Sequence, residues 1–197
     1  MSVVAVEPSQ VMIRQRPEGS APVVCAFAEQ LPFPDGMFDV ALAVLTTHHW
    51  HDPGAGLLEM RRVARSQVIV TWDPLVFAQK FWLVRDYLPE IGQREQLLPT
   101  LSTVLDVLGA ANVSALPVSA DCNDGVFGAY WRRPEAYLSN SIRSAMSGIA
   151  LTNPGVVEKA MKRLQADLAS GTWQTRNYEL LEMDELDLGY RIVSVTS

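Results

Sequence analysis

The sequence has few cysteines, no long apolar run and no excess of basic residues. Its two cysteines, Cys25 and Cys122, are far apart and form no CxxC pair, which argues against a disulfide framework or a cysteine-based zinc site. No apolar run approaches the ~18 residues of a membrane span. The N-terminus also lacks the basic and apolar regions of a secretory signal. These absences predict a cytoplasmic protein with no membrane partner.

The charge balance is acidic, with 16 Lys and Arg residues against 22 Asp and Glu residues. Proteins that bind nucleic acid through phosphate contacts usually present a basic face. The balance therefore predicts no nucleic-acid partner, although an acidic chain can still hold a local basic groove. At 197 residues, 48% of them hydrophobic, the chain is long enough for one domain with a sizeable core, and two small domains would also fit.

Short apolar runs alternate with helical patterns in the first half of the chain. We expect strands over residues 3–6, 22–27, 38–46 and 67–71, and helices that begin after Ser9 and at Asp52-Pro53. The run FDVALAVLT, residues 38–46, is continuously apolar, which is typical of a strand covered on both faces. This alternation predicts an α/β fold with a doubly wound, mostly parallel sheet.

The second half is richer in helical patterns. We expect a helix over residues 99–108 that Gly109 ends, a strand over 112–118, and a final strand over 190–195. Between these strands the pattern is mostly helical, and one long helix begins at Asn153 and ends at Gly171. Residues 124–185 are therefore predicted to form a helical insertion, or lid, within a single domain that spans residues 1–197.

Three stretches carry a recognisable pattern: AVEPS (5–9), AEQLPFPDGMFDVALAVLTTHHWHDP (28–53) and LLEMRRVARSQVIVTWDP (57–74). Together they resemble the class I S-adenosylmethionine-dependent methyltransferases, in particular the type 11 group that acts on small molecules. The resemblance covers residues 3–74, and LPFPDGMFD followed by HHWHDP is its most specific part. It implies a Rossmann-like fold, methyl transfer to a small-molecule acceptor, and S-adenosylmethionine as the cofactor.

Glu7 is the first candidate for cofactor binding. It follows a predicted parallel strand, and ligands of open α/β sheets bind at the carboxyl ends of the strands. A carboxylate at that place can accept both hydroxyls of a ribose, although an exposed Glu before a helix is also favoured by the helix dipole. The resemblance adds further cofactor-binding candidates: Phe27, Ala28, Glu29, Val44 and Leu45. In the family an Asp that reads adenine often stands where this chain has Phe27.

The stretch TTHHWHD, residues 46–52, follows the long apolar strand. The resemblance places His48 and His49 near the methyl donor, as a general base or as substrate contacts. Hydrogen bonds to the backbone explain such histidines equally well. Adjacent histidines on a loop rarely bind one ion, so no metal site is predicted. Three tryptophans are candidate walls of the acceptor pocket, with core packing as the alternative: Trp50, Trp72 and Trp82.

One feature of the resembled family has no counterpart here. The family places a strand and a glycine-rich loop before its AVEPS-like strand, whereas Gly54 and Gly56 follow a different strand. We therefore expect the chain to begin at the family's second strand, which would impair S-adenosylmethionine binding and leave strand edges open for a homodimer. The alternative functions are a non-catalytic binding or regulatory module that has lost the cofactor, and a cofactor-free enzyme that uses the histidines.

Overall fold

The computed structural model describes residues 2–109 and 111–196, which divide into two compact units. Unit 1 is built from residues within 1–71, 99–114 and 192–197, and unit 2 from residues 72–98 and 115–191. The expected insertion, residues 124–185, lies within unit 2, which also includes an earlier segment of the chain.

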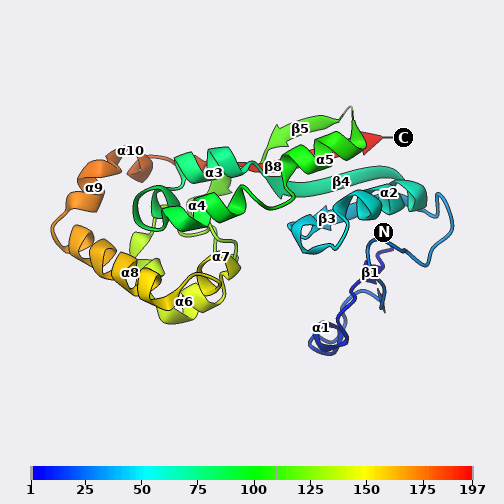
Figure 1. Ribbon diagram of the computed structural model, residues 1–197, viewed down its shortest axis with the longest axis horizontal. Helices are drawn as coiled ribbons and strands as arrows, with labels where there is room; N and C mark the ends of the chain where they lie inside the picture. The colour runs from blue at the N-terminus through cyan, green and yellow to red at the C-terminus, as the bar shows by residue number, and fades with distance from the viewer. Residues whose placement is uncertain (1, 110, 197) are drawn as a thin grey trace. The chain divides into compact units, whose positions relative to one another are not determined.

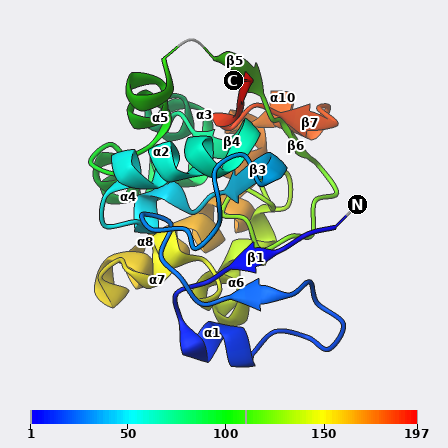
Figure 2. The same cartoon turned by 90° about the vertical axis from the view of Figure 1, so that its right-hand side faces the viewer.

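Unit 1 contains the strands that the sequence predicts (Figure 1). Its elements are β1 (Ala5–Val6), α1 (Gln10–Arg14), β2 (Val23–Val24), β3 (Phe38–Val44), the 3-10 helix η1 (Thr47–His49), α2 (Pro53–Val63), β4 (Ala64–Trp72), α5 (Leu101–Leu108), β5 (Asn112–Ala115) and β8 (Tyr190–Thr196). β4, β5 and β8 each extend past the boundary of unit 1 at one end. Strands β1 and β2 form a parallel pair (Figure 2), and a four-stranded sheet has the order β3-β4-β8-β5, with β3 and β4 parallel. The predicted Rossmann-like α/β fold class is confirmed.

Local sequence signals set the helix ends of unit 1. The Ser9 hydroxyl accepts a hydrogen bond from the Met12 N–H at the start of α1. Asp52 caps α2 by accepting from the Ala55 N–H, with Pro53 as the first helical residue. Gly109 ends α5 with a φ of 72°, a conformation that glycine adopts without steric cost. These boundaries agree with the sequence prediction.

Helices α2 and α5 pack on one face of the four-stranded sheet (Figure 1). The core beneath them joins buried residues of both helices and of β3, β4 and β8: Ala43, Leu57, Met60, Ile69, Val104, Leu108, Val193 and Val195. On the opposite face of β3, the side chains of Val40, Leu42 and Val44 are 54%, 64% and 52% exposed. The prediction that both faces of this strand are covered is therefore wrong, because β3 is an edge strand of its sheet and only its Ala41 and Ala43 side joins the core.

The turn LPFPDG, residues 31–36, is fastened to α2 by Arg62. The Arg62 guanidinium donates to the carbonyls of Leu31 and Phe33 at 3.0 and 2.8 Å. It also pairs with Asp35 and with Glu59, at 2.8 and 2.6 Å. The hydrogen bonds that Arg62 donates to Glu59 and Asp35 raise its pKa, so the guanidinium stays charged. This part of the recognisable pattern therefore has a structural role.

Unit 2 is mostly helical (Figure 1). Its elements are α3 (Pro74–Lys80), the π-helical turn η2 (Leu83–Tyr87), α4 (Pro89–Glu95), β6 (Val118–Ser119), the 3-10 helix η3 (Pro134–Leu138), α6 (Asn140–Ser144), α7 (Ser147–Ala150), α8 (Pro154–Ala169), α9 (Thr172–Arg176), α10 (Tyr178–Leu181) and β7 (Glu185–Leu186). Strands β6 and β7 pair antiparallel. As predicted, Asn153 caps α8 and Gly171 follows it with a φ of 76°. None of the described helices is long and apolar enough to cross a membrane.

The core of unit 2 is aromatic. Trp82 is fully buried, and its ring meets those of Tyr137 and Trp173 edge-on at 5.7 and 5.1 Å between centroids. The Trp82 indole N–H donates to the Trp131 carbonyl at 2.7 Å. Edge-on aromatic pairs add roughly 0.5–1.5 kcal/mol beyond the area that they bury. This cluster stabilises unit 2 from within.

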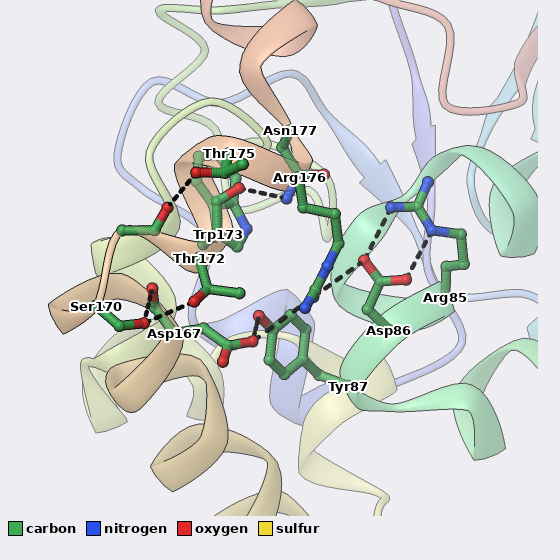
Figure 3. Close-up of polar contacts among 11 residues, drawn as sticks. Arg85, Asp86, Tyr87, Asp167, Ser170, Thr172, Trp173, Thr175, Arg176 and Asn177 are labelled. Atoms are coloured by element: carbon green, nitrogen blue, oxygen red, sulfur yellow. Dashed lines mark hydrogen bonds and ion pairs between the residues drawn. The ribbon is translucent and has the colours of Figure 1, made fainter.

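A polar network joins the turn η2 to helices α8 and α9 (Figure 3). The Tyr87 hydroxyl donates to Asp167 at 2.6 Å, and Arg176 lies 3.6 Å from Asp167 and 3.9 Å from Asp86. Burial and the hydrogen bond to Asp167 raise the pKa of Tyr87 to about 12, so its hydroxyl remains a donor at neutral pH. The network fixes these three elements to one another.

Candidate functional site

Glu7 lies at the carboxyl end of β1, beside β2. Its N–H donates to the Val24 carbonyl at 3.1 Å, which continues the β1–β2 pairing by one residue. Carboxylate atom Oε1 accepts a hydrogen bond from the Ser9 N–H at 2.8 Å, whereas Oε2 has no partner within residues 2–109 and 111–196. One carboxylate oxygen is thus used to fix the side chain, and the other can accept a hydrogen bond from a ligand.

The turn after β2 leaves the parallel pair at the same end as Glu7. Phe27 is 54% exposed, and its ring meets the His51 ring edge-on at 5.9 Å between centroids. Over the described parts of the chain, the Ala28 N–H makes no hydrogen bond. The turn can therefore offer one backbone donor and one aromatic ring to a planar ligand.

The Glu29 carboxylate binds the protein itself. Its Oε1 accepts hydrogen bonds from the backbone N–H groups of His51 and Asp52, at 2.8 and 3.2 Å. Partial burial raises the pKa of Glu29, but the hydrogen bonds from backbone N–H groups outweigh this effect and lower it. Glu29 is therefore ionised at neutral pH and fastens the loop after β3 to the turn after β2.

The backbone at the end of β3 has an unusual conformation. Leu45 has a φ of 47°, the one positive φ among the described residues other than glycine. Such a conformation costs of order 1–3 kcal/mol and occurs mostly at functional sites. Two residues later Thr47 is buried, and its hydroxyl has no hydrogen-bond partner in the part of the chain that the structure covers. The predicted cofactor residues Val44 and Leu45 thus border a strained segment.

His48 and His49 lie in η1, directly after this strained segment. Their ring centroids are 3.9 Å apart with the planes tilted by 45°. Burial lowers the pKa of His48 to about 4, with a smaller contribution from His49, so the His48 imidazole is neutral at pH 7. Across residues 2–109 and 111–196, no three His, Cys, Asp or Glu side chains are grouped so that they could hold a metal ion.

Two of the three tryptophans predicted for the acceptor pocket have clear packing roles. Trp50 packs against the core of unit 1, and a Cβ added at Gly56 would lie 2.4 Å from its ring. Trp82 is fully buried in unit 2 and presents no surface to a ligand. Trp72, at the end of β4, is 6% exposed. Their contact with an acceptor stays a prediction, and the packing alternative accounts for what is seen of Trp50 and Trp82.

The geometry fits the adenosine part of S-adenosylmethionine. Glu7 offers a carboxylate oxygen suited to a ribose diol, and Ala28 a backbone donor suited to an adenine edge.

The comparisons with known proteins agree with the fold. Residues 1–71 match the family model Methyltransf_11, a methyltransferase domain. A solved structure from Anabaena variabilis, assigned as a methyltransferase from an antibiotic biosynthesis pathway, is 31% identical to this chain. The match covers 98% of this chain and 81% of that one, with a TM-score of 0.84. The chain belongs to the class I S-adenosylmethionine-dependent methyltransferases.

Two other relatives match shorter parts of the chain. The uncharacterized protein YafE of Escherichia coli (strain K12) is 46% identical over 39 residues, which are 20% of this chain and 19% of that protein. The alignment thus spans about a fifth of the length of this curated relative. A methyltransferase structure from Thermotoga maritima is 22% identical over 58% of each chain, with a TM-score of 0.45. These two similarities add nothing on the substrate.

Proposed function

We propose that this protein transfers a methyl group from S-adenosylmethionine to a small-molecule acceptor in the cytoplasm. The observation that carries the proposal is that Glu7 Oε2 and the Ala28 N–H lie at the same end of the β1–β2 pair. Neither group has a hydrogen-bond partner in the described parts of the chain. The cofactor supplies an electrophilic methyl group on its sulfonium. The chain's contribution is to hold the acceptor in line with that methyl group, which requires few specialised residues.

Six of the candidate residues can then be given roles in this reaction. Glu7 accepts hydrogen bonds from the ribose hydroxyls, while Phe27 and the Ala28 N–H hold the adenine. His48 is neutral at pH 7, and its low pKa makes it a weak general base. We therefore assign His48 and His49 chiefly to contact with the acceptor. Glu29 acts on the ligand site only through the loop that it holds.

Replacement of Glu7 tests the cofactor site. Glu7→Ala removes the carboxylate, and losing a charged hydrogen-bond pair should weaken S-adenosylhomocysteine binding about 10- to 100-fold. Isothermal titration calorimetry measures this change. Glu18→Ala, which removes a carboxylate from an exposed position in the same unit, is the matched control. Equal affinity in the wild-type and Glu7→Ala proteins would exclude Glu7 as the ribose ligand.

The histidines require a turnover assay with an identified acceptor. We expect His48→Ala/His49→Ala to lower turnover at least about tenfold while S-adenosylhomocysteine still binds, because the loss affects the acceptor and not the cofactor. A steady-state methylation assay, combined with calorimetry on the same variant, separates these effects. Full turnover in the double variant would assign both residues to packing.

We propose further that the methionine part of the cofactor gains little affinity in the chain of residues 1–197. The groups that unit 1 offers to a ligand, Glu7 and the Ala28 N–H, are suited to the adenosine half of the cofactor, and the alternative function is a non-catalytic methyltransferase-like module. Calorimetry with adenosine and with S-adenosylhomocysteine tests this directly. We expect the two dissociation constants to agree within about tenfold. S-adenosylhomocysteine binding more than about 100-fold tighter than adenosine binding would overturn the proposal.

A further inference from the structure

Unit 2 contains a hollow of about 590 Å³ to which no function has been assigned above. It is lined by residues of η3, α6, α7 and α8; helices α6, α7 and α8 are neighbours in both ribbon views (Figures 1 and 2), and η3 packs against α6 and α8. All of these residues belong to unit 2, so the hollow is complete within one unit. Its volume lies within the range of roughly 300–1,000 Å³ that is usual for small-molecule sites.

The lining combines an apolar floor with a polar rim. Ile149, Val157 and Met161 are buried side chains that form the floor. Methionine adapts its flexible thioether to ligands of different shape. The rim carries neutral groups that can donate or accept hydrogen bonds: Asn140, Ser144, Thr152 and Gln165. Such a lining is suited to a ligand with an apolar body and a polar end.

The charges of the lining favour an anion, in contrast to the net charge of −6 of the whole chain. Arg143 and Lys162 are the cations, and Glu158 is the carboxylate. Glu158 is already paired with Lys162 at 2.7 Å, an exposed pair one helical turn apart on α8. An exposed pair of this kind contributes little to stability, so Lys162 can change partner at small cost.

Arg143 is the unbalanced charge. It is partly buried, and within the described ranges no carboxylate lies at ion-pair distance from it. Its guanidinium donates to the Tyr137 carbonyl at 2.7 Å and reaches the Asn140 side chain at 3.5 Å. The contact with Tyr137 fixes the orientation of the group, and further N–H donors remain available. A partly buried arginine without a carboxylate partner can bind the carboxylate of a ligand through its free N–H groups.

We propose that this hollow binds a small organic carboxylate with an apolar body. Arg143 binds the carboxylate, Lys162 adds a second positive charge, and Ile149, Val157 and Met161 contact the apolar body. The proposal goes beyond the methyl-transfer function and does not depend on it, because none of the cofactor candidates of unit 1 lines the hollow.

Calorimetry with 4-phenylbutyrate tests the proposal on the full chain without cofactor. The uncharged amide, 4-phenylbutanamide, has the same apolar body and should bind at least about 5-fold more weakly, because it cannot form the charged pair with Arg143. Absence of 4-phenylbutyrate binding up to about 10 mM, or equal binding of the acid and the amide, would overturn the proposal.

Substitutions in α6 and α8 locate the bound acid. Arg143→Gln should weaken 4-phenylbutyrate binding at least about 5-fold, and Lys162→Gln about 2-fold. Ser144→Glu keeps Arg143 but offers it a competing carboxylate, so it should also weaken binding at least about 5-fold even if Arg143→Gln perturbs folding. Lys159→Gln removes a charge from α8 outside the hollow and is the matched control. Unchanged affinity in folded Arg143→Gln and Ser144→Glu proteins would refute this site.

Discussion

The apolar face of strand β3 in unit 1 and the aromatic core of unit 2 differ in their exposure to solvent. In unit 1, Val40 and Leu42 on one face of β3 are more than half exposed. In unit 2, Trp82, Trp131 and Trp173 are at most 1% exposed. Unit 2 therefore buries its tryptophans, although leucines such as Leu75 and Leu97 are exposed, whereas unit 1 leaves an apolar strand face open.

The polar groups of the two units also differ in whether they have partners. The polar and charged side chains around Tyr87 in unit 2 form hydrogen bonds and ion pairs with one another (Figure 3). In unit 1, Glu7 Oε2 and the Ala28 N–H have no partners within the described ranges. The comparison indicates that unit 2 derives its stability internally, while the strand ends of unit 1 retain hydrogen-bonding groups for a ligand.

The largest expected effect is on the aromatic core of unit 2. Trp82→Ala removes a fully buried indole and leaves the Trp131 carbonyl without its donor, so it should lower the free energy of unfolding by about 3–5 kcal/mol. Trp82→Phe, which keeps most of the packing, should cost less. Urea unfolding followed by circular dichroism measures both changes. If Trp82→Ala cost less than about 1 kcal/mol, the contrast between the units would fail.

A smaller effect is expected at the contact between two turns of unit 1. Glu29→Ala removes the acceptor of the His51 and Asp52 N–H groups and should lower the free energy of unfolding by about 1–2 kcal/mol. Glu29→Gln keeps an oxygen acceptor and should cost less. Urea unfolding measured across a pH series checks both.

The pH dependence follows from the direction of the Glu29 pKa shift. The pKa is lowered in the folded protein, so the stabilisation is complete above the ordinary glutamate pKa and is lost as the pH falls through the folded value. The stability difference between the wild-type and Glu29→Gln proteins should therefore shrink in acid. A difference that does not change between about pH 3 and pH 7 would show that the charge of Glu29 contributes nothing.

The smallest effect on folding, and the most direct test of the open strand face, concerns Leu42. We propose that this face and the free edge of β3 pair two copies of the chain, as exposed apolar edge strands tend to do. Leu42→Lys should then reduce the dimer fraction about tenfold in size-exclusion chromatography with light scattering, while stability changes by less than about 0.5 kcal/mol. Leu75→Lys, at a similarly exposed leucine of unit 2, is the control. A monomeric wild-type chain would exclude the pairing.

The sequence predicts most of the fold because helix and strand boundaries depend on local signals. Ser9, Asp52 and Gly109 act on neighbouring backbone groups, so their positions are sufficient to place helix ends. The open face of β3 could not be predicted in this way, because a continuous apolar run looks the same whether one or both faces are covered.

The site is less predictable, because its groups meet through tertiary structure. The place of Glu7 after a strand and the resemblance to the family, for Ala28, indicate these two residues, but nothing in the sequence shows that the Glu29 carboxylate reaches the His51 and Asp52 N–H groups. The positive φ of Leu45 also has no local signal, since leucine rarely adopts this conformation. The fold of unit 1 creates both features.

The close approach of Gly56 to the Trp50 ring has a consequence for protein engineering. Any side chain at position 56 would have to displace this indole, because a Cβ there would lie 2.4 Å from the ring. Trp50 follows His49 directly in the chain, and its displacement would be transmitted to the histidine loop through the backbone. Substitutions at position 56 in α2 would therefore change the conformation of the loop that we propose contacts the acceptor, while His48 and His49 are left intact.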